Sequence, residues 1–496
     1  MSLSAAARPT LSRHRWWALA AALALTVTGC QAPEEDQAAE GASQEQSASA
    51  PAEGGQEGDT DADDAEGSGD SEDAEGSDGS DGSDDSDGSE DAEGSEDSEG
   101  GADESTNEEK WKEASEKGVA PIPREPMPEN PEVPNEESWR TVPSNVPMKR
   151  LEEGEKPPQF VLVSFDGGGW HDRWQTFMET AQEHDARFTV FLTGIYLVEK
   201  ANSEIYQGPK QEPGDAAVSF YPDEESIAQL VDDLNQANSR GHEIGTHYNG
   251  HFCASSKNGA DTWSTEDWQS ELDQFFDFIT NYRENNGYGA DFPTLEVQPD
   301  SIRGGRLPCL DGKWSDLVPA WKEHGITYDT SRSSTLGTGV HWPYSQDGLW
   351  QFEVPVVYSP AFDGPESPAK EGDDSPIVTA MDYNFWAKIN GAKNEPEKRD
   401  VMHDAALETY RYMYASAYAG NRAPLVLGNH FNGWNDNAFN PAVEQFMSEV
   451  CGEPDTYCTT HRDVIQWLSL QDPERVKQWQ SAEASARGDD LEDITW

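Results

Sequence analysis

A short strand that runs into a histidine-bearing loop is predicted by residues 241–251, which read Gly241-His242-Glu243-Ile244-Gly245-Thr246-His247-Tyr248-Asn249-Gly250-His251. The strand covers residues 243–246, and the loop carries His247 and His251. Neutral imidazole is the commonest metal-ligand side chain, so a His-x-x-x-His loop can point two imidazoles at one cation. The spacing is weak evidence alone, because the chain has 11 histidines and such a pair also arises by chance. The residues around the pair therefore decide how it is interpreted.

Strand-like apolar runs alternate with helical patterns on both sides of this stretch. The strand-like runs are 159–165, 187–192, 325–328 and 424–429, and the helical patterns are 173–184, 224–239, 265–282, 317–324 and 402–419. The pair Ser264 and Asp267 is typical of a helix start at residue 265. Alternation of this kind predicts parallel strands joined by crossover helices. We expect an α/β fold over residues 158–479, a length that suits an α/β barrel.

Titratable side chains stand where several predicted strands end. Asp166 follows the first strand, His247 follows the strand at 243–246, Arg306 follows residues 301–305, and His430 follows the last strand. In parallel α/β folds the chemistry collects at the carboxyl ends of the strands. These four residues are therefore candidates for one site.

Taken together, the segments resemble the polysaccharide deacetylases, the NodB-homology family also called carbohydrate esterase family four. Residues 241–251 resemble its Gly-His-Glu-Ile-Gly-x-His-(Ser/Thr)-x-x-His segment, with Tyr248 where Ser or Thr is usual. Residues 164–168, Ser164-Phe165-Asp166-Gly167-Gly168, resemble its Thr-Phe-Asp-Asp-Gly motif. Arg306-Leu307-Pro308-Cys309 resembles Arg-x-Pro-(Tyr/Phe), and residues 425–430 resemble Leu-x-x-His in a loose form. The resemblance implies a deformed (β/α) barrel of the NodB-homology type.

The resemblance also implies an activity, the removal of N-acetyl groups from an amino-sugar polysaccharide such as peptidoglycan or a chitin-like glycan. It implies that His247 and His251 bind a divalent metal, Zn²⁺ or else Co²⁺. Asp166 would be the general base and His430 the general acid, with Asp329 a weaker match to the carboxylate that orients the acid.

Three further side chains have suggested roles near the site. Arg306 would hold a carboxylate and tune its partner. Trp170 and Trp434 could line a sugar platform or an acetyl pocket, although tryptophan is as often a core residue.

One departure from the family motif concerns the metal. Gly167 stands where the family has its metal-binding Asp, so two imidazoles are one protein ligand short of the three usual at a catalytic zinc. Asp166 could itself turn to the metal, or Asp382, His171 or Asp172 could fill the gap. Alternatively, the domain binds cell-wall glycan without turnover.

Four cysteines follow Cys30, and they allow three pairings. Their spacing matches no zinc finger, so we expect disulfides. If the histidine and arginine motifs face one cleft, a bond between Cys253 and Cys309 would tie them together. Cys451 and Cys458 would then close a small loop.

The first residues resemble an export signal. A basic start, an apolar run at 16–27 and Thr28-Gly29-Cys30 are typical of a bacterial lipoprotein signal peptide over 1–29, with lipid on Cys30. We therefore expect export and anchoring to the outer face of the cell membrane.

A tether with an extreme charge follows. Residues 31–109 hold 31 acidic residues and no Lys or Arg, which is about half of the net charge of −62. Such a composition predicts a disordered acidic tether over 30–113, followed by a Pro-rich linker at 114–157. Residues 480–496 are a predicted acidic tail. The chain lacks the basic footprint that nucleic-acid binding requires, so we expect no nucleic-acid partner. We also expect a monomer.

Overall fold

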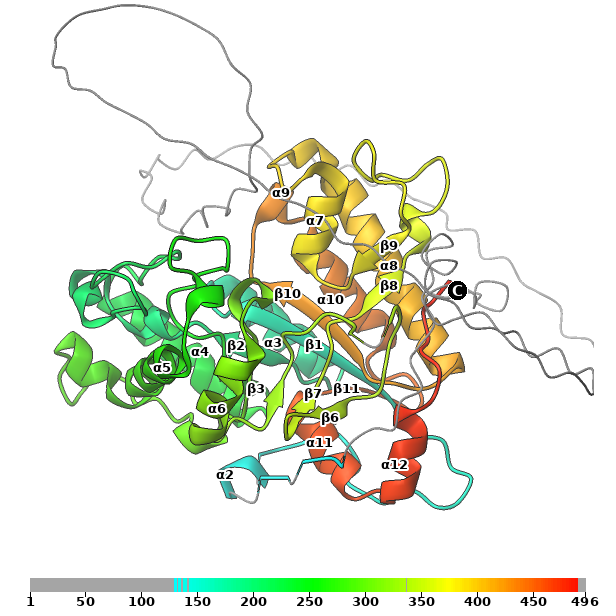
Figure 1. Ribbon diagram of the computed structural model, residues 1–496, viewed down its shortest axis with the longest axis horizontal. Helices are drawn as coiled ribbons and strands as arrows, with labels where there is room; N and C mark the ends of the chain where they lie inside the picture. Colours follow the sequence, from blue (N-terminus) through cyan, green and yellow to red (C-terminus); the bar gives the residue numbers. More distant parts are fainter. Residues whose placement is uncertain (1–128, 132, 135–136, 141, 336, 489–496) are drawn as a thin grey trace, which may run out of the picture. The chain divides into compact units, whose positions relative to one another are not determined.

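Parallel strands form the centre of the computed structural model (Figure 1). The structure describes residues 129–131, 133–134, 137–140, 142–335 and 337–488. The chain divides into two units, 1–42 and 43–496, and every described residue belongs to the second. The predicted signal peptide, Cys30, the predicted tether, and most of the predicted linker before residue 142 lie outside the described residues.

The strands and helices alternate along the chain. The strands are β1 (Gln159–Gly167), β2 (Thr189–Leu192), β3 (Glu243–Thr246), β4 (Gly304–Gly305), β5 (Tyr328–Asp329), β6 (Tyr344–Gln346), β7 (Leu349–Gln351), β8 (Val356–Tyr358), β9 (Ile377–Thr379), β10 (Leu425–His430) and β11 (Thr456–Cys458). The helices are α2 (Glu137–Arg140), α3 (His171–Glu183), α4 (Glu224–Ser239), α5 (Thr265–Asn286), α6 (Trp314–Glu323), α7 (Asp382–Asn390), α8 (Arg399–Ala419), α9 (Trp434–Asn437), α10 (Phe439–Val450), α11 (His461–Ser469) and α12 (Pro473–Gln480).

The sheet curls into an incomplete barrel. Its strand order is β10-β1-β2-β3-β4-β5-β7-β6, with β11 paired to β1, and only the β6–β7 pair is antiparallel. Beyond β7 the chain continues into β8, which pairs with β9. Met381, just after β9, forms a parallel bridge with Gly428 of β10. The sheet thus returns to β10, and the expected deformed (β/α) barrel is confirmed.

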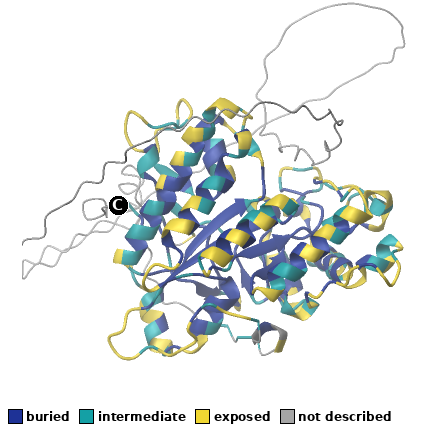
Figure 2. Cartoon of the chain, turned by 180° about the vertical axis from the view of Figure 1, so that it is seen from behind, coloured by how far each residue is buried: buried dark blue, intermediate teal, exposed yellow. Residues whose placement is uncertain are grey.

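Apolar strands and capped helices explain these elements. Most of β1 is buried, as expected for a parallel strand that is covered on both faces. Figure 2 shows the same contrast between a buried sheet and helices with exposed outer faces. The expected start of α5 is present as a capping box, in which Ser264 and Asp267 each bond the other's backbone N–H.

The packed residues extend beyond 158–479 on both sides. Trp139 and Val146 are buried, and both belong to the predicted linker. At the other end, Ser485 forms an antiparallel bridge with Val340, and Ala486 is fully buried. The predicted tail therefore begins with residues that pack on the domain. Among the described residues, no helix combines the length and apolar character of a membrane span.

Candidate active site

Side chains from neighbouring strand ends meet at one edge of the sheet. The register of β1 and β10 pairs Asp166 with His430, and Thr246, just before His247, pairs with Gly305, just before Arg306. These four side chains come from β1, β3, β4 and β10, which lie side by side in the sheet apart from β2.

A buried ion pair joins Asp166 to Arg306. Nη1 of Arg306 donates to Oδ1 of Asp166 at 3.0 Å, and neither side chain is more than 3% exposed. The guanidinium also donates to the carbonyl oxygen and hydroxyl of Thr330, at 3.0 and 3.1 Å, and lies over the Phe191 ring. Burial alone would raise the pKa of Asp166, but Arg306, His247 and His430 outweigh it and lower that pKa. Asp166 is therefore a carboxylate at neutral pH.

The two loop histidines are neutral at pH 7. Nδ1 of His247 lies 2.8 Å from the carbonyl oxygen of Arg306, which favours the tautomer with the proton on Nδ1 and the lone pair on Nε2. The ring centroids of His247 and His251 are 5.3 Å apart. Burial is the main cause that lowers the pKa of His247 to about 4 and that of His251 to about 3. Neutral imidazoles are in the form that binds metals.

These pKa values predict acid sensitivity in the metal-free protein. From about pH 6.5 to about pH 4 the unfolded chain binds protons on both histidines and the folded chain does not, so stability falls as the pH falls. We expect the loss of unfolding free energy between pH 7 and pH 5, measured by urea unfolding with a chelator, to shrink in a His247→Gln, His251→Gln double variant. Some loss should persist, because buried His242 and His461 also have lowered pKa values. If the double variant lost as much unfolding free energy as the parent, the lowered pKa values assigned to His247 and His251 would be wrong.

A buried glutamate that the sequence pattern does not single out holds the histidine loop. Oε1 of Glu271, on α5, accepts from the backbone N–H of Asn249 at 2.9 Å and of Gly250 at 3.3 Å. Its Oε2 accepts from the Tyr206 hydroxyl at 3.0 Å. Tyr248, between the histidines, is buried and its hydroxyl accepts from Trp321. Contacts from α5 and α6 thus hold the part of the loop that lies between the two histidines.

The carboxylate that orients His430 is Asp382, which corrects the expectation for Asp329. Nδ1 of His430 lies 2.8 Å from Oδ1 of Asp382, and the His430 backbone N–H donates to Oδ2 at 2.8 Å. Asn432, which the sequence did not suggest, donates to the same Oδ2 at 2.9 Å. Asp329 instead accepts from the backbone N–H and hydroxyl of Ser331. Asp382 follows Met381, whose bridge to Gly428 of β10 brings Asp382 beside His430.

The described residues supply an incomplete metal site. No set of three His, Cys, Asp or Glu donors that includes both His247 and His251 lies within 4.8 Å of one another among them. Asp382 is engaged by His430, and Nδ1 of His171 lies 2.9 Å from Asp233, so neither fills the gap. The two imidazoles suit a divalent metal, but the usual third protein ligand is lacking.

The space beside Gly167 is bordered by hydroxyl groups. A Cβ at this position would lie 3.6 Å from the Tyr196 hydroxyl and 3.9 Å from that of Thr193, which is ordinary contact. Gly167 itself has φ of 86°. There is room for a side chain, at the cost of a left-handed backbone.

Aromatic side chains lie beside His430. The Trp434 ring is 5.1 Å from the His430 ring and stacks on Trp386 at 4.8 Å. Trp170 and Tyr383 are among the more exposed large side chains, each 36% exposed. This cluster could contact a sugar ring.

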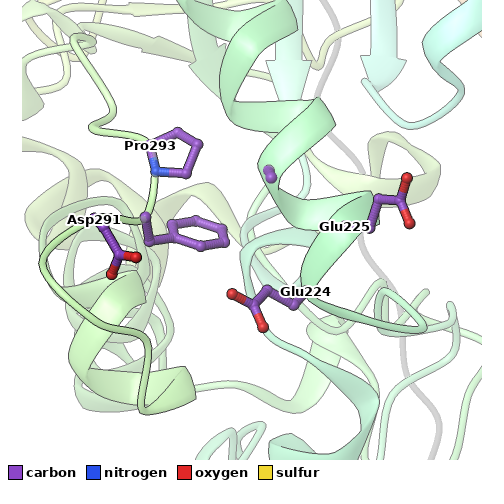
Figure 3. Close-up of a pocket in the computed structure, with 6 residues that line it drawn as sticks. Glu224, Glu225, Asp291 and Pro293 are labelled. Atoms are coloured by element: carbon purple, nitrogen blue, oxygen red, sulfur yellow. The ribbon is translucent and has the colours of Figure 1, made fainter.

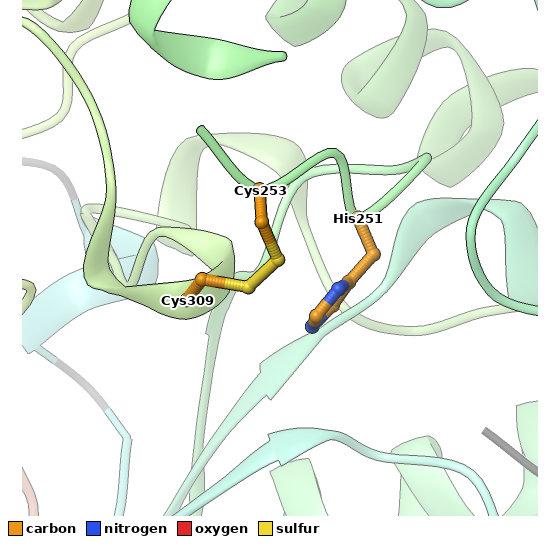
Figure 4. Close-up of side chains that lie close together, drawn as sticks. All are labelled: His251, Cys253 and Cys309. Atoms are coloured by element: carbon orange, nitrogen blue, oxygen red, sulfur yellow. A yellow bond between two sulfur atoms is a disulfide. The ribbon is translucent and has the colours of Figure 1, made fainter. Parts of the chain in front are cut away.

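Both expected disulfides are present, Cys253–Cys309 and Cys451–Cys458. The first joins the histidine loop to the segment after Arg306. In Figure 4 the His251 ring lies beside this bond.

A separate pocket of about 420 Å³ lies at the start of α4, away from these residues (Figure 3). Its lining includes Glu224, Glu225, Asp291 and Phe292, and none of the candidate site residues. Its acidic lining gives no reason to assign it a role.

Comparison with known proteins gives structural matches only. No family model and no curated protein matches the sequence. The chain is similar in structure to polysaccharide deacetylases. A provisionally named polysaccharide deacetylase from Mycobacterium smegmatis matches with 15% identity over 67% of this chain and 95% of its own, at a TM-score of 0.36.

Two further matches have lower identity. A family 4 carbohydrate esterase from Streptomyces lividans, solved with acetate, has 12% identity over 60% of this chain and 91% of its own, at a TM-score of 0.30. A family 4 pseudoenzyme from Bacillus anthracis has 8% identity over 62% of this chain and 65% of its own, at a TM-score of 0.27.

Proposed function

We propose that this protein is a hydrolase that removes N-acetyl groups from an amino-sugar polysaccharide, either peptidoglycan or a chitin-like glycan. One observation carries the proposal. An ionised carboxylate, Asp166, and a carboxylate-bound imidazole, His430, stand at paired positions of adjacent strands, next to two neutral histidines. Amide hydrolysis requires a base for water and an acid for the leaving amine, and this pair supplies both types of group.

Each group has a defined task. The Asp166 carboxylate takes the proton from the attacking water, while Arg306 holds one of its oxygens in place. Asp382 accepts from Nδ1 of His430, which directs Nε2 to deliver a proton to the sugar nitrogen. Imidazole is the side chain that most often performs such a transfer, so His430 is suited to it.

We propose that His247 and His251 are the protein's ligands for a divalent metal, most simply Zn²⁺. Such an ion would lower the pKa of a bound water and polarise the amide carbonyl. The described residues lack a third ligand beside both histidines.

We also propose that the protein is exported and held at the outer face of the bacterial cell membrane by lipid on Cys30. The basic start, apolar run and Thr28-Gly29-Cys30 support this anchoring.

Acetate release by the full chain tests the activity. With Zn²⁺ or Co²⁺ added, we expect acetate from N-acetylglucosamine oligomers or from peptidoglycan. His430→Asn should lower the rate by ~10²–10⁴-fold, the usual contribution of a positioned acid. His403→Asn is the matched control, because His403 also bonds a carboxylate, Asp404, but on α8 outside the site. No acetate under any metal condition, or equal rates for the His430 variant and the parent, would refute the assignment.

A second function is favoured by Gly167, which removes a metal-ligand position. The protein would then bind cell-wall glycan without cleaving an amide. Retention of the full chain on peptidoglycan or chitin beads, together with no acetate release, is the result expected for this function.

A further inference from the structure

His251 lies beside the sulfur atoms of one disulfide. Ligand atoms of His251, Cys253 and Cys309 all lie within 4.8 Å of one another, and they are the only such trio of His, Cys, Asp or Glu among the described residues (Figure 4). They come from two segments, the loop after β3 and the turn at Pro308–Leu310. Cys253 is buried, His251 is half-buried and Cys309 is exposed, so a small reductant can reach the bond from the Cys309 side.

We propose that reduction of the Cys253–Cys309 disulfide creates a metal site in which both thiolates and His251 bind one soft divalent cation, such as zinc. Two thiolates and an imidazole are a common ligand set for zinc, and thiolates select zinc over harder cations. His247, whose ring centroid is 5.3 Å from that of His251, could supply a fourth ligand. The site does not depend on the proposed hydrolase activity.

The chemistry of the step balances with a dithiol as the reductant. The dithiol gives two electrons and two hydrogens, closes to its own disulfide, and breaks the bond between Cys253 and Cys309. Each new thiol loses its proton to solvent as its sulfur binds the cation.

Other contacts hold the two segments together when the disulfide is open. The backbone N–H of Ala254, next to Cys253, donates to Oδ2 of Asp311 at 2.9 Å, which links the histidine loop to the segment after Cys309. Nδ1 of His247 lies 2.8 Å from the carbonyl oxygen of Arg306. The thiols would therefore remain close to His251 after reduction.

His251 belongs to two ligand sets, the proposed thiolate site and the pair of imidazoles His247 and His251. In the oxidised protein the two imidazoles are the donors that the described residues offer to a cation there. In the reduced protein the thiolates would draw the cation toward Cys253 and Cys309. The redox state of one disulfide would then decide which ligand set holds the metal.

Cobalt spectroscopy of the full chain tests the proposal. We expect Co²⁺ to give a thiolate-to-cobalt charge-transfer absorption only after treatment with a phosphine reductant, at one cobalt per chain, and reoxidation to abolish it. A Cys253→Ser, Cys309→Ser double variant should lack the absorption. A Cys451→Ser, Cys458→Ser variant is the matched control and should keep the absorption. Among the described residues, no histidine lies close enough to that disulfide to form a group of three donors with it.

The role of His251 is tested in the same titration. Loss of a residue that only hydrogen-bonds a metal ligand weakens metal binding by ~10–100-fold. His251→Ala should weaken cobalt binding by more than this, because His251 would itself be a ligand. No absorption in the reduced parent protein would overturn the proposal without recourse to any variant. An absorption lost only in the Cys451 and Cys458 variant would also overturn it. Acetate release is measured on the oxidised protein, so failure of the hydrolase proposal is a separate result.

Discussion

Replacing Asp166 with asparagine is expected to lower acetate release by ~10²–10⁴-fold and the free energy of unfolding by about 3–5 kcal/mol. Asparagine keeps the shape of the side chain but cannot take a proton from water. It also removes the carboxylate that bonds the buried Arg306 guanidinium, which would keep its hydrogen bonds to Thr330 and its contact with the Phe191 ring. Urea unfolding and acetate release, measured on the same preparation, separate the two losses.

A second buried ion pair provides the control for this variant. Asp463 is also buried beside an arginine, Arg462 at 3.6 Å, and accepts from the hydroxyls of Ser144 and Thr459. It lies on α11, outside the site. Asp463→Asn should therefore destabilise the protein while the folded fraction keeps the activity of the parent. Equal acetate release by the Asp166 variant and the parent, per folded molecule, would remove Asp166 from the reaction.

The fold was predictable because its signals are local. The run at 159–165 is apolar at five of its seven positions, as expected for a short strand that is covered on both faces, and it forms β1 in the structure. The strand at 243–246 and the start of α5 were predicted at the residues where the structure has them. Chain ends were harder to predict, because Ser485 pairs with distant Val340 and the next residue, Ala486, is fully buried, which composition does not encode.

The site was predictable only where a residue follows a strand directly. Asp166, His247, Arg306 and His430 meet because parallel strands end at one edge. The partner of His430 is set by tertiary structure. Asp382 is 48 residues away in the sequence and comes beside His430 through the bridge between Met381 and Gly428 of β10. Asp329 ends a strand too, but its neighbour Ser331 takes up its carboxylate. Strand-end position therefore does not reveal which way a side chain turns.

Replacing Gly167 with aspartate is expected to complete the metal site and to raise acetate release in the presence of Zn²⁺. The new carboxylate supplies the oxygen ligand that His247 and His251 lack, and we expect zinc affinity to rise by more than the ~10–100-fold worth of an outer-shell partner. A Cβ here meets the Tyr196 hydroxyl at 3.6 Å, an ordinary contact distance, so the first atom of the new side chain is accommodated. Zinc titration by calorimetry, with acetate release beside it, measures the effect.

The substitution carries a cost that zinc should reverse. Gly167 has φ of 86°, and a non-glycine residue with left-handed backbone costs roughly 1–2 kcal/mol. A second carboxylate beside Asp166 adds repulsion in the metal-free protein. At a zinc concentration of 100 times the dissociation constant, binding would return about 2.7 kcal/mol of stability. Gly167→Asn shares the backbone strain and the shape but not the charge, so it should be destabilised without this recovery. Equal zinc affinity in the Asp and Asn variants would mean that residue 167 does not face the metal, and that any third ligand must come from elsewhere in the chain.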